Sequence, residues 1–159
     1  RHHSIRNSFG DTIMTAYSAS LPARQSKLSA ASLAPHAHWL LRIGFASVFL
    51  FHGIGKFAAP VQFAEMMQLP LVVVLLVALA EVGGGLAILA GGALGKGWMT
   101  RLGGLVTVPV MIGAIVMVHW GQWSFVATDS HPMGGMEFQV VLLLMGLYYL
   151  VHGNSERSA

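Results

Sequence analysis

The chain has 159 residues, of which 55% are hydrophobic and only 9% are charged, whereas a soluble domain is about one quarter charged. Its nine basic and six acidic residues give a pI near 9.7, yet they form no dense basic and aromatic patch, which excludes a nucleic-acid partner. The absence of cysteine excludes disulfides, thiol chemistry within the chain and metal centres with cysteine ligands.

The first 35 residues are rich in Ser and Ala and carry four basic residues but one acidic residue. They lack the apolar core of a secretory signal peptide, so we expect a flexible tail, and a basic, acid-poor leader is also compatible with an organellar transit peptide. The first methionine is Met14, which leaves the natural start open. We therefore expect a tail over 1–35, a membrane domain over 36–153 and a short C-terminal tail over 154–159.

Four apolar stretches approach the roughly 20 residues that a helix needs to cross a bilayer. They lie near residues 39–59, 69–94, 102–120 and 136–152. The sequence thus predicts an all-α fold, a bundle of four transmembrane helices surrounded by the lipid bilayer.

The distribution of basic residues predicts the orientation of this bundle. An even number of spans places both termini on one side, and eight of the nine Lys and Arg residues fall on that side. Lys56 is the exception. Because basic residues are retained in the cytoplasm, we expect both termini to be cytoplasmic.

Small residues in the second span predict a close helix contact. Ala87, Gly91 and Gly95 recur at every fourth position, and Gly83 extends the series. Helices in lipid associate largely through such small residues, so we expect this face to pack against a neighbouring helix.

Polar residues interrupt the first span at regular intervals. Arg42, Phe45, Phe49, His52 and Lys56 are spaced by 3, 4, 3 and 4 residues, which places them on one helical face. A cation is costly in lipid, so we expect this face to point into the bundle. The alternative for Arg42 and Lys56 is that each extends to the headgroups on its own side.

Three further polar residues lie in the other spans, namely Glu81, His119 and Glu137. At about 1.5 Å of rise per residue, Lys56, His119 and Glu137 fall within roughly 5 Å of the outer boundary. His52 falls about 10 Å, Glu81 about 18 Å and Arg42 about 25 Å below it. We therefore expect an outer trio, with His52 and Glu81 leading inward to Arg42. The alternatives are that Glu137 stabilises a helix N-terminus and that His119 is an interfacial residue without a partner.

Several chemistries fit such a set of side chains. A quinone headgroup needs hydrogen-bond donors and a proton route, which His and carboxylates supply. Haem would need His52 and His119 as axial ligands from two spans. A metal site from His52, His119 and Glu137 is also possible, although the spacing matches no metal-binding signature.

Four short motifs stand out, namely "LLRIGFASVFLFHGIGKF", "AEVGGGLAILAG", the third span led by Arg101 and "GGMEFQVVLLLMGLYYLVHG". Together they resemble the DoxX family of small four-helix membrane proteins. The residues that carry the resemblance are Arg42, His52, Gly53, Lys56, Glu81, Gly84, Gly85, Gly135 and Glu137. The resemblance extends from Trp39 to Gly153 and implies a bacterial or archaeal inner-membrane bundle.

The resemblance also implies a link to quinone-dependent electron transfer, since family members include subunits of thiosulfate:quinone oxidoreductase and terminal quinol oxidase complexes. Other members are linked to membrane redox defence. On this hypothesis Lys56, His119 and Glu137 bind the quinone, while His52 and Glu81 relay protons. No covalently bound cofactor is expected, and other membrane subunits are expected partners.

Two alternative functions remain open. The first is a non-catalytic scaffold or accessory subunit of a larger respiratory or photosynthetic complex, in which the polar residues fix the helix register. The second is a carrier for protons or small solutes, although such carriers are usually built from paired repeats that this chain does not clearly contain.

Overall fold

The structure, a computed structural model, describes residues 34–154. Of the predicted tails, 1–35 and 154–159, residues 1–33 and 155–159 lie outside the described residues. The chain divides after Ala37 into two units, and the described part of the first holds the short 3-10 helix η1, Ala34–His36. All regular secondary structure between residues 34 and 154 is helical, which confirms the all-α prediction for that part of the chain.

Four long helices account for most of the second unit. They are α3 (His38–Ala58), α5 (Leu71–Ala93), α6 (Gly97–Ala114) with its π-helical continuation η2 (Ile115–His119), and α7 (Glu137–His152). Within the described residues α3, α5 and the joined α6–η2 are long and apolar enough to cross a membrane, whereas α7 has 16 residues and is a shorter apolar helix. Three candidate spans and one shorter helix are therefore present.

The short helix α4 (Pro60–Met67) is an element that the sequence analysis did not predict. Proline lacks a backbone N–H and disfavours helix before it, so Pro60 ends α3 and begins α4 at a position where proline is tolerated. Gln68 ends α4 in the left-handed conformation with φ of 55°. Pro70 then precedes the first residue of α5.

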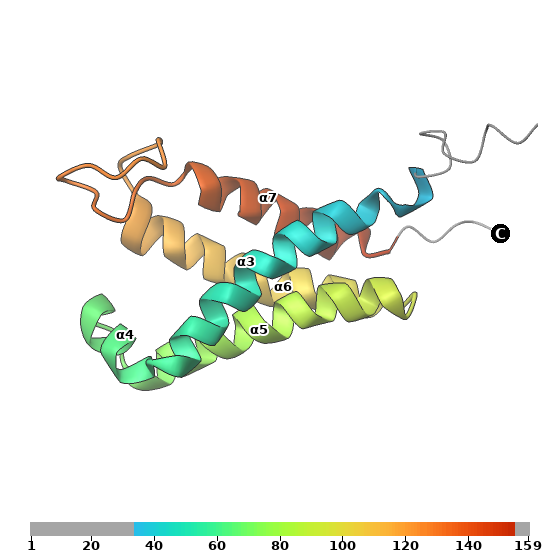
Figure 1. Ribbon diagram of the computed structural model, residues 1–159, viewed down its shortest axis with the longest axis horizontal. Helices are drawn as coiled ribbons and strands as arrows, with labels where there is room; N and C mark the ends of the chain where they lie inside the picture. Colours follow the sequence, from blue (N-terminus) through green and yellow to red (C-terminus); the bar gives the residue numbers. More distant parts are fainter. Residues whose placement is uncertain (1–33, 155–159) are drawn as a thin grey trace, which may run out of the picture. The chain divides into compact units, whose positions relative to one another are not determined.

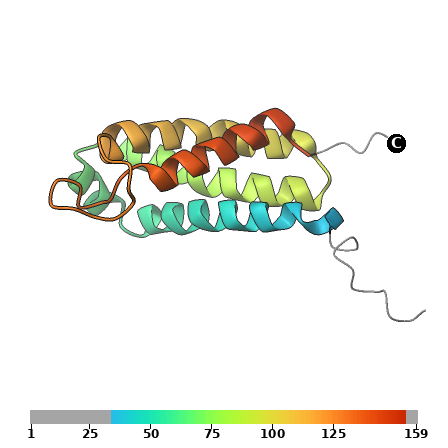
Figure 2. The same cartoon turned by 90° about the horizontal axis from the view of Figure 1, so that it is seen from above.

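The helices pack in chain order, α3 on α5, α5 on α6 and α6 on α7. Figures 1 and 2 show α4 and the loop over 120–136 at one end of these helices, here called the loop end. The start of α3, the turn between α5 and α6 and the end of α7 lie at the opposite end, here called the turn end (Figure 1). Neighbouring helices in this order run antiparallel.

The outward faces of these helices are strongly apolar. Leu40 is 76% exposed, Phe51 is 77% exposed and Val151 is 77% exposed, and large apolar side chains are exposed on every long helix. A soluble monomer rarely exposes apolar surface on this scale. Together with the length of the spans, this surface identifies a membrane protein embedded in lipid.

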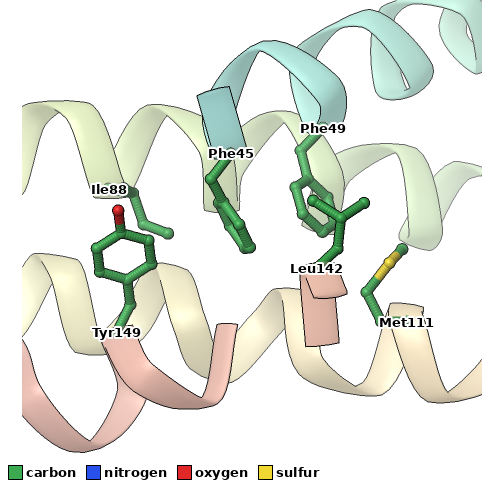
Figure 3. Close-up of a cluster of buried hydrophobic side chains, with 6 residues drawn as sticks. All are labelled: Phe45, Phe49, Ile88, Met111, Leu142 and Tyr149. Atoms are coloured by element: carbon green, nitrogen blue, oxygen red, sulfur yellow. The ribbon is translucent and has the colours of Figure 1, made fainter. Parts of the chain in front are cut away.

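The interior is a thin layer of side chains between the helices (Figure 3). Its buried cluster consists of Phe45, Phe49, Ile88, Met111, Leu142 and Tyr149. The rings of Phe45 and Tyr149 pack edge to face with their centroids 5.4 Å apart, which brings α3 and α7 into contact. Otherwise α3 packs mainly on α5, and α7 mainly on α6.

Glycines form the closest helix contacts, and in the predicted series of α5 this is confirmed at Gly91, which packs against Thr100 of α6. A Cβ on Gly103 would lie 2.8 Å from the carbonyl oxygen of Gly84, and one on Gly104 would lie 2.6 Å from that of Gly146. Gly83, in contrast, has open space around it. The predicted face of α5 is therefore wrong at Gly83, because the buried stripe of α5 runs through its neighbour Gly84.

Candidate functional site

Lys56 on α3 and Glu81 on α5 form a buried ion pair. The Lys56 Nζ atom donates to Oε1 of Glu81 at 2.8 Å and to Oε2 at 2.7 Å. The two side chains are only 9% and 5% exposed. A buried pair of this kind is stable when each charge satisfies the other, because neither can be solvated by water.

Gly53 permits the helices to approach closely enough for this pair. A Cβ at Gly53 would lie 2.7 Å from Cγ2 of Val82 and 3.0 Å from Cβ of Glu81. Any larger residue would push α3 away from α5 at this level. Gly53 is thus the position on α3 that sets the depth of the ion pair.

The ion pair between Lys56 and Glu81 shows that their predicted depths, which differ by about 13 Å, are wrong. Side chains on a helix lean toward its N-terminus, and α3 and α5 are antiparallel. Lys56 therefore leans toward the turn end, while Glu81 leans toward the loop end. Gly53, one turn before Lys56, already lies against Glu81, so the two backbones are closer in depth than the predicted span ends place them, and the lean of the side chains closes the remaining turn.

Helix α4 covers the pair on the side of the loop end. The Lys56 Nζ atom lies 4.9 Å from the centre of the Phe63 ring, within the range of a cation–π contact. Phe63 belongs to α4, so the short helix supplies a third contact to the ammonium group. The pair is therefore enclosed by α3, α4 and α5.

His52 does not point into the bundle, contrary to the prediction. Its side chain is exposed, and its ring packs edge to face against Phe51 with the centroids 5.5 Å apart. The inward position on this turn is occupied by Gly53, since the buried stripe of α3 passes through Ala46, Phe49, Gly53 and Lys56. His52 lies beside that stripe, on the exposed surface of α3.

His119 is buried at the end of η2 and holds the loop over 120–136. Its Nδ1 lies 2.9 Å from the carbonyl oxygen of Gly134, and its Nε2 lies 3.0 Å from Nε2 of Gln139. Because a carbonyl can only accept, Nδ1 carries the hydrogen and Nε2 accepts from the Gln139 amide. Both ring nitrogens of His119 are thus engaged in hydrogen bonds.

Glu137 contacts the loop rather than the ion pair. Its Oε2 accepts a hydrogen bond of 3.3 Å from the backbone N–H of Phe125. None of the hydrogen bonds or ion pairs within residues 34–154 joins two members of the predicted trio of Lys56, His119 and Glu137. The three residues that the predicted depths grouped together therefore make separate contacts at the loop end.

His52, His119 and Glu137 do not form the metal site that the sequence analysis left open. Among residues 34–154 no three His, Cys, Asp or Glu side chains gather closely enough to hold a metal ion. His52 is exposed on α3 while His119 is buried on η2, which separates the ligands that such a site would require.

Arg42 is the centre of a polar cluster at the turn end and is only 4% exposed. Its Nη1 donates to the carbonyl oxygen of Ile88 at 2.7 Å and to Oγ1 of Thr100 at 3.0 Å. Its Nη2 donates to Oδ1 of Asn154 at 2.6 Å, and the guanidinium lies 5.4 Å from the centre of the Tyr149 ring. Arg42 thus links α3 to α5, α6 and the segment that follows α7.

Sequence reasoning missed the partners of Arg42. Thr100 donates to Oδ1 of Asn154 at 2.7 Å, and Nδ2 of Asn154 donates to the carbonyl oxygen of Gly91 at 2.7 Å. These partners are uncharged, so a search for complementary charges does not find them. Their positions could have indicated the contact, because Thr100 and Asn154 lie at the same end of the helices as Arg42.

Comparison with known proteins identifies the family. The DoxX family model matches residues 37–120, which is more than half of the chain. The matched region spans α3 to η2 and includes Arg42, His52, Lys56 and Glu81, whereas Glu137 and α7 lie outside it. No curated protein and no solved structure matches the chain significantly. The extent of the family match establishes that this chain is a membrane protein of the DoxX family.

Proposed function

We propose that this chain is a membrane subunit linked to quinone and quinol electron transfer, with its quinone site around His52, Lys56 and Glu81. The observation that carries this proposal is the buried ammonium–carboxylate pair, one helical turn from an imidazole exposed on the bilayer side. Residues four apart on a helix are neighbours, so His52 and Lys56 lie on adjacent turns of α3.

A quinone dissolved in the bilayer would reach His52 first. The imidazole can donate a hydrogen bond to a quinone carbonyl or accept one from a quinol hydroxyl. An exposed imidazole within a span is costly in hydrocarbon, and a polar headgroup beside it would lower that cost. His52 is therefore assigned the contact with the headgroup.

We assign to the ion pair behind His52 a role in accepting the protons that a quinol releases. A quinol that is oxidised releases two protons and two electrons. The Glu81 carboxylate can take up one of these protons and the His52 imidazole the other, and the adjacent Lys56 ammonium stabilises the carboxylate once its proton has left. The electrons require an acceptor, which we place in a partner subunit.

His119 and Glu137 have a different role in this proposal. Both contact the loop over 120–136, and neither contacts Lys56 or Glu81. They hold the loop in place at the loop end rather than binding the headgroup. This narrows the quinone site from the five residues suggested by the sequence to three.

We also propose that α7 is a fourth span and that both termini are cytoplasmic, in the inner membrane of a bacterium. Sixteen residues rise about 24 Å, and local thinning of the bilayer accommodates the remaining few ångströms at modest cost. Arg42, Lys96 and Arg101 lie at the turn end, whereas Lys56 is neutralised by Glu81. This bias supports a cytoplasmic turn end.

Equilibrium binding of a short-chain ubiquinone to the purified protein in nanodiscs tests the proposed site. We expect saturable binding by calorimetry, and an affinity about tenfold weaker in His52→Ala because one hydrogen bond is lost. Ser47→Ala is the matched control, since Ser47 is also exposed on α3 and bonds only locally, to the carbonyl oxygen of Gly44. Absence of saturable binding, or equal affinities for the two variants, would overturn the proposed site.

The Arg42 cluster favours a second candidate function, that of a scaffold or accessory subunit in a larger membrane complex. The cluster satisfies most of the polar groups of Arg42 with groups from the same chain and joins four segments. Such an arrangement stabilises helix register without any ligand. Stable copurification with partner subunits and no bound quinone would favour this second function.

A further inference from the structure

An apolar groove of about 300 Å³ lies between α3 and α7. It is lined by Leu41 from α3 and by five residues of α7, namely Val141, Leu144, Met145, Tyr148 and Tyr149. The helices pack in the order α3, α5, α6 and α7, so this groove is at the seam between the first and the last. Its volume is at the lower limit for small-molecule pockets, and its lining is almost entirely hydrocarbon.

The groove ends near polar side chains at the turn end. Tyr148 is half exposed, and its ring stacks on the exposed imidazole of His152 with the centroids 5.0 Å apart. The ring of Tyr149 separates the groove from Arg42, and in Figure 3 its hydroxyl points toward Ile88. A molecule lying along α7 would thus have an apolar wall for its tail and two hydrogen-bonding groups at one end.

The charges of the described residues are divided between the two ends. Their four carboxylates belong to α4, the first half of α5, the loop over 120–136 and the start of α7, namely Glu65, Glu81, Asp129 and Glu137. Three of their four Lys and Arg residues lie at the turn end, namely Arg42, Lys96 and Arg101. The partners of Arg42 are neutral, so the guanidinium keeps its full charge there. The turn end therefore attracts anions.

We propose that the groove binds an acyl chain of an anionic phospholipid, whose phosphate is held by Tyr148 and His152. Both side chains can donate hydrogen bonds to phosphate oxygens, which are strong because the acceptor is charged. Arg42 contributes through its positive field rather than by contact, since it is buried behind Tyr149. This site is at the opposite end from His52 and does not rest on the quinone proposal.

Lipid titrations of the full chain test this inference. The delipidated protein in detergent is titrated with phosphatidylglycerol and with phosphatidylcholine of the same acyl chains, and bound lipid is counted by native mass spectrometry. Both lipids carry a phosphate, but the ammonium of phosphatidylcholine cancels its charge, so we expect one phosphatidylglycerol to bind about tenfold more tightly in the positive field of the turn end. Equal affinities for the two lipids would overturn the preference for an anionic lipid.

Two tryptophan variants test the groove itself. Leu144→Trp fills the groove, while Leu76→Trp is the matched control, because both leucines are 60% exposed and Leu76 lies on α5 outside the groove. In Leu144→Trp the groove should lose contact with two or more methylene groups of the acyl chain, which should weaken lipid binding by about tenfold or more. Leu76→Trp should bind lipid as the wild type does. Equal binding by the two variants would overturn the inference. A dimer that appears in the native mass spectrum of the wild type and is absent for Leu144→Trp would also overturn it, because the groove would then bind a second copy of the chain.

A double variant tests the headgroup contacts. Tyr148→Phe combined with His152→Ala removes both donors from exposed positions and leaves the groove wall in place. We expect phosphatidylglycerol and phosphatidylcholine both to bind about tenfold more weakly, because both headgroups carry the phosphate that these donors hold. Unchanged affinity for both lipids would overturn the assignment of these two residues. Displacement of the bound lipid by a short-chain ubiquinone at equal concentration would instead assign the groove to a quinone.

Discussion

The amino group of Lys56 lies 2.7 Å and 2.8 Å from the two carboxylate oxygens of Glu81, although these residues belong to separate antiparallel helices. Lys56 has no other carboxylate bonded to it among residues 34–154. The pair thus joins α3 to α5 in the half of the molecule nearest the loop end. Because the pair is buried, water does not solvate either charge, and each charge is stabilised by the other.

Removing one charge of this pair should destabilise the protein more than removing both. Glu81→Gln leaves a buried ammonium unpaired, which we expect to lower the free energy of unfolding by about 3–5 kcal/mol. The double variant Lys56→Met with Glu81→Met should recover most of this loss, because apolar side chains of similar size suit the site. Thermal unfolding in detergent measures the difference. A single variant as stable as the wild type would show that the ion pair is not buried as described.

Gly53→Ala should separate α3 from α5. The added methyl group would lie 2.7 Å from Cγ2 of Val82 and 3.0 Å from the carbonyl oxygen of Ala78, and we expect a loss of about 1–3 kcal/mol. Gly55→Ala is the control on the same helix, since it has nothing within 4 Å and alanine favours helix. The two unfolding midpoints, measured side by side, should move in opposite directions. Equal shifts would contradict the helix contact at Gly53.

His119→Phe should release the loop over 120–136. The variant loses the hydrogen bonds to Gly134 and Gln139, each of which contributes about 1 kcal/mol. Hydrogen exchange of the loop amides should become faster, whereas exchange in α5 should not change. His152→Phe, an exposed change at the turn end, provides the control. Unchanged exchange in the loop would show that His119 does not anchor it.

The proposed orientation can be tested with single cysteines, because the chain has none of its own. We expect a membrane-impermeant maleimide to label Ser130→Cys in intact bacterial spheroplasts. Lys96→Cys, at the turn between α5 and α6, should react only after the membrane is lysed. Both positions are exposed, so a difference in labelling reports the side of the membrane. Labelling of Lys96→Cys in intact cells would reverse the proposed orientation.

The helices were largely predictable from the sequence, since long apolar runs leave few alternatives to a membrane span. The predicted stretch 136–152 and α7, Glu137–His152, differ by one residue, because Gly135 and Gly153 bound a mostly apolar run. Helix α4 was missed because eight residues that begin at Pro60 and end shortly before Pro70 carry too little periodicity to indicate a helix.

The pairing of the polar side chains was less predictable. Depths calculated from assumed span ends placed Lys56 and Glu81 apart, whereas the packing of α3 on α5 brings Gly53, one turn from Lys56, against Glu81. His52 and Gly53 are adjacent in sequence, and only the packing against Val82 decides which of them faces inward. Thr100 and Asn154 were missed because a neutral partner for a buried cation leaves no charge pattern in the sequence.

Photo-crosslinking with an azido-quinone in native membranes tests the proposed quinone site most directly. After irradiation and digestion, we expect the label on the α3 peptide that contains His52, and we expect excess unlabelled quinone to suppress it. The label should be lost in His52→Ala and retained in Ser47→Ala. Labelling confined to α7, or labelling of α3 that excess quinone does not suppress, would contradict a quinone site at His52, Lys56 and Glu81.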